Sequence, residues 1–95
     1  MDFSAVLGLL KQDLGISNKL RDTYLSSLIE GTYTELGKRA VHLDLSNVDD
    51  TLFLSDYCAW VYRKRISGEP MPEHLKLRMR NYQVRNRGVS NADKQ

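Results

Sequence analysis

The stretch Thr51–Ser67, TLFLSDYCAWVYRKRIS, decides the fold of this 95-residue chain. Its apolar residues cover nearly every side of a helix until Arg63, Lys64 and Arg65 follow in a row. A helix that is apolar all round is buried among other elements, whereas a surface helix carries a single apolar stripe. We therefore expect a buried central helix whose basic end lies in solvent, because cations are favoured at a helix C-terminus.

Two further helices are predicted before this stretch. Apolar residues recur at helical spacing over residues 3–14, and Gly15 supplies the left-handed conformation that ends a helix. Ser17 or Asn18 then caps a second helix, whose apolar face includes Leu20 and Tyr24 and runs to about Lys38.

The segment between the second and the central helix has an ambiguous pattern. Gly31 weakens the second helix by about 1 kcal/mol relative to Ala, so a bend or an early end near Gly31 stays open. Residues 39–48 alternate apolar and polar side chains as a strand does, but a lone strand has no partner. We expect an extended connection held by its apolar residues, which are Val41, Leu43, Leu45 and Val48.

The remaining boundaries are marked by capping residues. Asn47 is the expected cap of the central helix, with Asp49 and Asp50 as first-turn acids, and Gly68 marks its end. A Pro-containing turn then starts a fourth helix, which Gly88 ends. The inward stripe of that helix consists of Leu75, Met79 and Tyr82, and basic residues occupy most of the remainder.

The fold class is therefore an all-α bundle of four helices, with a buried central third helix and a basic amphipathic fourth helix. A chain of this length fits one domain, which we place at residues 1–88. Residues 89–95 are polar enough to form a mobile tail. The predicted core includes Leu28, Phe53, Tyr57, Trp60, Val61, Leu75 and Met79.

Enzymatic function is not indicated. His42 and His74 lie in different segments without the spacing of metal ligands. Cys58 lies inside the apolar stretch, where a cysteine is more often a small core residue than a nucleophile. Asp49 and Asp50 are explained by helix capping. We expect no catalysis, no cofactor and no metal.

Charge is divided along the chain, although the total is close to balanced. Residues 1–56 hold five Lys or Arg against nine Asp or Glu, a net charge of −4. Residues 57–95 hold nine against three, a net charge of +6. Such a division favours association between unlike surfaces. No apolar segment approaches the roughly 20 residues that span a bilayer, and the N-terminus carries acids where a signal peptide carries cations, so neither membrane insertion nor export is expected.

The basic residues of the second half form the candidate partner-binding set. They could contact nucleic acid, an acidic protein surface, or only solvent. An isoelectric point near 8.8 ranks a protein partner and a solvated face above specific DNA binding. Trp60 and Tyr62 lie beside this set, where aromatic residues serve as interface anchors, although Trp60 shares a face with core residues. The set consists of Arg63, Lys64, Arg65, Arg78, Arg80, Arg85 and Arg87.

The order of these segments resembles the small head-tail connector proteins of tailed bacteriophages and prophages. The resemblance covers about residues 7–87. It is carried by the helix that contains DYCAWVYRKR, with Leu14–Ile16, the LDLS connection and the Pro-containing turn before EHLKLRMRN as further matches. The residues that match the family pattern most closely are Asp56, Tyr57, Trp60, Tyr62 and Arg63.

The resemblance implies a non-enzymatic head-completion adaptor. Copies of such a protein form a ring beneath the portal, extend the channel for packaged DNA, and dock the next connector or the tail. It implies a location at the head-tail junction of the virion, after synthesis in the bacterial host cytoplasm. A ring is built from contacts between unlike surfaces of neighbours, which suits the charge division of this chain.

A DNA-binding regulator is the alternative from another functional class. Asn81, Gln83 and Asn86 lie among the arginines of the fourth helix, as in helices that read base edges. A long buried helix and a Pro-rich turn before it differ from the compact helix-turn-helix motif.

Overall fold

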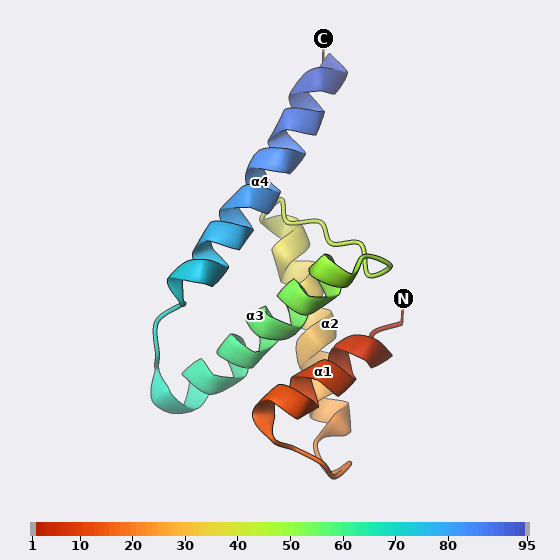
Figure 1. The fold of residues 1–95 in the computed structure, drawn as a ribbon, viewed down its shortest axis with the longest axis vertical. Coiled ribbons are helices and arrows are strands. Elements are labelled where there is room, and N and C mark those ends of the chain that lie inside the picture. Colours follow the sequence, from red (N-terminus) through yellow and green to blue (C-terminus); the bar gives the residue numbers. More distant parts are fainter. Residues whose placement is uncertain (1, 95) are drawn as a thin grey trace.

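The computed structural model describes the backbone of residues 2–94 and the side chains of residues 2–85. The chain forms four helices: α1 (Ser4–Leu14), α2 (Asp22–Lys38), α3 (Val48–Ser67) and α4 (Glu73–Lys94). Within residues 2–94 no strand forms, and residues 39–47 connect α2 to α3 without one. These elements confirm the all-α class (Figure 1).

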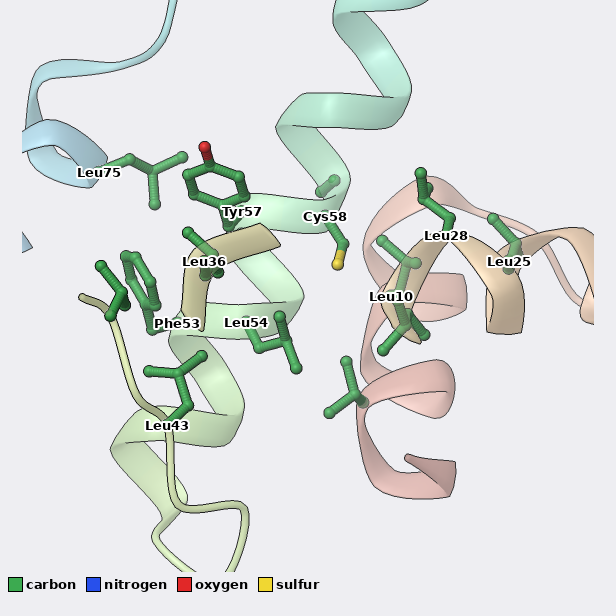
Figure 2. Packing of buried hydrophobic residues seen from close by; sticks show 14 of the residues in the cluster. Leu10, Leu25, Leu28, Leu36, Leu43, Phe53, Leu54, Tyr57, Cys58 and Leu75 are labelled. Atoms are coloured by element: carbon green, nitrogen blue, oxygen red, sulfur yellow. The ribbon is translucent and has the colours of Figure 1, made fainter. Parts of the chain in front are cut away.

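The third helix is the centre of the bundle. It packs against α1, α2 and α4 (Figure 1). Among the described residues, α3 is the only helix on which α4 packs. Phe53, Leu54 and Cys58 of α3 are fully buried, together with Leu10 of α1 and Leu25 of α2 (Figure 2). This arrangement follows from the apolar coverage of α3, because several of its sides must be removed from water at once.

The predicted core residues lie at different depths. Leu28, Phe53, Tyr57 and Leu75 are buried. The other three, Trp60, Val61 and Met79, are half-buried and pack against the edge of the core. Trp60 is large and carries an N–H group, so a position at the rim satisfies that donor without loss of packing.

Four of the predicted helix ends are confirmed, among them the end of α2 at Lys38. The Asn47 side chain accepts hydrogen bonds from the backbone N–H groups of Asp49, at 2.8 Å, and Asp50, at 3.3 Å. Gly15 and Gly68 have φ of 72° and 69°, a left-handed conformation that glycine adopts at low cost at the end of a helix.

The predicted start of α2 is wrong. Ser17 and Asn18 do not cap this helix, which begins at Asp22. The Asn18 side chain instead accepts the backbone N–H of Leu20 at 3.1 Å, so it stabilises the turn before the helix. The helix continues through Gly31 without an early end, and a Cβ atom at that position would meet no other atom within 4 Å.

The connection between α2 and α3 lies against the bundle for part of its length. Val41 and Leu43 are buried, and the Tyr33 hydroxyl donates to the Leu43 carbonyl oxygen at 3.1 Å. Leu45 is half-buried. Val48 was expected to hold the connection but is 72% exposed, because it is already the first residue of α3 and points away from the core.

The fourth helix uses its predicted stripe but not its predicted end. Leu75 and Tyr82 are buried against α3, and Met79 is half-buried. The helix continues beyond Gly88 to Lys94, because glycine lowers helix stability by only about 1 kcal/mol and keeps its N–H donor. The structure describes side chains only to residue 85. The prediction of a mobile tail at residues 89–95 and the predicted role of Arg87 therefore lie outside the described residues.

Candidate interaction surface

Two tyrosines and two arginines form a cluster where the N-terminal end of α2 lies beside the C-terminal end of α3. We call Arg21, Tyr24, Tyr62 and Arg65 the tyrosine–arginine cluster. Arg21 donates to the Tyr62 hydroxyl, and Arg65 donates to the Tyr24 hydroxyl. The two rings meet edge to face with centroids 6.4 Å apart, and the Arg65 guanidinium lies 5.7 Å from the Tyr24 centroid. The four side chains therefore hold one another in place.

The guanidinium groups of this cluster keep their charge available to a partner. Among residues 2–85, neither Arg21 nor Arg65 forms an ion pair with a carboxylate, because their hydrogen-bond partners are neutral hydroxyls. Leu20 and Ile66 beside them are 89% and 78% exposed. Together these side chains line a hollow of about 340 Å³. Tyrosine and arginine are enriched among the residues that contribute most to binding at protein interfaces.

The other basic residues at the end of α3 are partly engaged within the chain. Arg63 donates to the carbonyl oxygen of Asp13 at 3.2 Å and pairs with its carboxylate at 3.4 Å. The Lys64 ammonium lies 4.5 Å from the Trp60 ring centroid. Arg63 therefore joins α3 to the end of α1, whereas the contact of Lys64 lies within α3, and both side chains remain exposed.

Within residues 2–85 the basic residues of α4 differ in how far they are engaged by the rest of the chain. Arg78 of α4 is half-buried, pairs with Asp56 at 3.0 Å and lies 5.1 Å from the Phe53 centroid. Its charge is therefore paired with a carboxylate of α3 at the partly exposed junction of the two helices. Arg85 stacks on Tyr82 at 5.1 Å, and Arg80 is exposed.

A second concavity lies between α2 and α3. It has a volume of about 410 Å³, with Leu28, Tyr57 and Trp60 among its apolar walls and Glu35 and Lys64 among its charged ones. Gly31 opens it, because a side chain there would extend into free space.

Sequence reasoning missed Leu20 and Arg21 as surface residues. It placed Tyr24 and Leu20 on the apolar face of α2, because the helix was expected to begin earlier. The later start puts Leu20 in the turn, where its side chain is not covered by α3. Leu20 lies between Lys19 and Arg21 in the sequence, and these flanking cations were the available signal that this segment is exposed.

Cys58 of α3 is a buried free cysteine. Burial raises the pKa of the Cys58 thiol to about 12, so the nucleophilic thiolate is disfavoured. Figure 2 shows its sulfur on the side of α3 that faces Leu10 and Leu28. His42 and His74 are both exposed. Across the described residues no group of three or more His, Cys, Asp or Glu is placed to hold a metal ion.

None of the helices in the described part of the chain combines the length and the hydropathy that a membrane span requires. Comparison with known proteins gives no relative: no family model, no curated protein and no solved structure matches this chain. The function must therefore be argued from the residues and their geometry.

Proposed function

We propose that this chain is a structural head-tail connector of a tailed phage or prophage. In this role it joins a ring beneath the portal, extends the channel for packaged DNA and docks the next connector or tail protein. Its site would be the head-tail junction of the virion. Neither an enzymatic activity nor a cofactor belongs to this proposal.

The strongest support for the proposal comes from the contacts that the residues of the DYCAWVYRKR motif on α3 make with the rest of the chain. Asp56 pairs with Arg78 of α4, and Arg63 contacts Asp13 near the end of α1. Tyr62 accepts from Arg21 at the start of α2, and the Trp60 indole N–H donates to the Glu69 carbonyl oxygen at 3.2 Å. Each polar motif residue thus ties α3 to a different part of the chain. A motif used in this way specifies a rigid building block rather than a reaction.

Surface chemistry supports the same assignment. The tyrosine–arginine cluster and its exposed leucine and isoleucine form a pre-ordered contact surface at one end of the bundle. Ordered side chains lose little conformational entropy on binding, which favours assembly of small subunits.

Deletion of the gene from the phage or prophage that encodes the chain tests the proposal. The expected result is DNA-filled heads and free tails in separate fractions, seen by electron microscopy, because the two parts lack their connection. A plasmid copy of the wild-type gene should restore tailed particles. Tailed, infectious particles from the deletion strain would exclude the connector role.

A DNA-binding regulator is the second candidate, favoured by the exposure of Arg80, Asn81 and Arg85 on α4. Ion pairing of Arg78 with Asp56 removes one cation from that face. A gel-shift assay with random duplex at physiological salt separates the two functions, with Arg80→Glu as the control variant. A regulator would shift the duplex and lose the shift on substitution, whereas a connector of the proposed kind would leave the duplex free.

A further inference from the structure

The two ends of α3 carry surfaces of opposite character. The basic end consists of the tyrosine–arginine cluster with Leu20 and Ile66. The acidic end lies at the start of α3, where Val48 and Leu52 are 72% and 40% exposed. Residues 44–52 contain no Lys or Arg and three Asp, of which Asp44 and Asp49 are exposed, whereas residues 19–24 and 62–66 contain five Lys or Arg and one Asp.

At the acidic end, charge and apolar surface lie within one helical turn. Val48 and Leu52 are four residues apart and therefore share a face of α3, with Asp49 beside them. The Asp49 side chain is exposed and forms no ion pair within residues 2–85. The Asp44 carboxylate accepts from the Ser46 hydroxyl at 2.6 Å and its N–H at 3.0 Å, which lowers the pKa of Asp44 and keeps it charged.

Helix electrostatics accounts for the charges but not for the apolar groups. Acids at the N-terminus and bases at the C-terminus of α3 are favoured by the helix dipole. This effect gives no reason for four large apolar side chains to face water at the same two ends. Exposed apolar groups that cluster within a charged rim are typical of interaction sites.

The two ends cannot meet within one molecule. Val48 and Ile66 are both on α3, and 18 residues of helix separate them by about 27 Å. The complementary surface for each end is therefore available on a second copy. A contact between unlike surfaces leaves one of each free, so it propagates into a ring or a filament.

We propose that the acidic end of one copy docks on the basic end of the next. Val48 and Leu52 pack against Leu20 and Ile66, and Asp49 lies between the guanidinium groups of Arg21 and Arg65. The hollow of about 340 Å³ at the basic end receives the apolar side chains. This inference rests on the proposed connector function, because it names the subunit contact of the ring.

Two variants, each with one end altered, test the contact. The basic-end variant carries Leu20→Asp and Ile66→Asp, and the acidic-end variant carries Val48→Asn and Asp49→Asn. All four side chains are exposed, so helix content by circular dichroism should remain that of the wild type. Sedimentation velocity then measures the size distribution of each protein over a concentration series.

Wild-type protein is expected to self-associate with rising concentration, while each variant alone stays monomeric, with a dissociation constant raised at least about tenfold. An equimolar mixture of the two variants should form a dimer that grows no further, because each variant supplies the end that the other lacks. A control variant with Leu77→Lys and Val84→Lys alters exposed apolar residues of α4 and should assemble as the wild type does.

Three results would overturn the contact: variants that assemble like the wild type, a mixture that stays monomeric, or wild-type protein that is monomeric up to about 1 mM. The deletion test of the connector function is separate. Tail-less heads after gene deletion, together with variants that still assemble, would reject this contact and keep the function. Tailed particles after deletion, together with a dimer of the two variants that grows no further, would reject the function and keep the contact.

Discussion

At the scale of single residues, Asp50 joins three parts of the fold through one buried carboxylate. Its Oδ2 atom accepts the backbone N–H of Asp44 at 2.8 Å, and its Oδ1 atom accepts the hydroxyl of Tyr82 at 2.5 Å. The connection, α3 and α4 thereby meet at one side chain. Sequence reasoning assigned Asp50 only a helix-capping role, because its two long-range donors are 6 and 32 residues away in the chain.

Replacing Tyr82 with Phe should lower the free energy of unfolding by about 1–3 kcal/mol at pH 7, because the buried carboxylate of Asp50 loses a donor. Urea unfolding followed by circular dichroism measures this difference. Tyr33→Phe is the matched control, since its hydroxyl donates to a neutral carbonyl and should cost about 0.5–1.5 kcal/mol. An equal or larger loss in the control would contradict the special role of the Tyr82–Asp50 pair.

Alkaline pH should affect the wild type and the Tyr82→Phe variant differently. Burial, with the hydrogen bond to Asp50, raises the pKa of Tyr82 from 10.0 to about 12. The folded state thus favours the neutral phenol, and its contribution to stability is complete below pH 10 and is lost as the pH rises toward 12. The stability difference between the two proteins should narrow over that interval in urea titrations at each pH. A constant difference would show that Tyr82 does not titrate this way.

At the scale of elements, α3 was predictable because its signals are local. The asparagine cap, the terminal glycine and the apolar coverage all lie within the helix or next to it. The start of α2 and the end of α4 were not predictable in this way. Asn18 can cap a helix or stabilise a turn, and Gly88 can end a helix or be tolerated inside one. Tertiary packing decides between such options, and the sequence pattern does not record it.

Asn47→Ala should lower the free energy of unfolding by about 0.5–2 kcal/mol, because two backbone N–H groups at the start of α3 lose their acceptor. Thermal unfolding measures the loss. Asn18→Ala provides the matched control, since Asn18 caps no helix and its replacement should cost less. If Asn18→Ala proved the more harmful substitution, the assignment of the two asparagines would be reversed.

At the scale of the whole molecule, the sequence predicted the charge division but not where the charges act. Arg78 counted toward a basic contact set, yet it forms an ion pair with Asp56 of α3 within the chain. Leu20 and Val48 were assigned to packing, yet both are exposed at ends of the fold. Whether an apolar residue near a helix end is buried or exposed depends on where that helix begins. An error in the predicted helix start therefore changes which residues are predicted to lie on the surface.

A small bundle also makes each core residue decisive for the whole fold. Phe53 is fully buried, with ring centroids 5.0 Å from Tyr82 and 5.9 Å from Tyr57. Phe53→Ala should cost about 3–5 kcal/mol, a large share of the total stability of a domain. Urea unfolding of this variant, compared with the exposed control Leu77→Ala, checks the value. A loss within about 0.5 kcal/mol of the control would place Phe53 outside the core.

The single tryptophan offers a way to watch this molecule without a label. Its indole borders the concavity between α2 and α3, bonds to the turn before α4 and lies beneath a lysine ammonium. Its fluorescence therefore responds to displacement of that turn, to a ligand in the concavity and to loss of the lysine. One optical signal can then follow each of these events in real time.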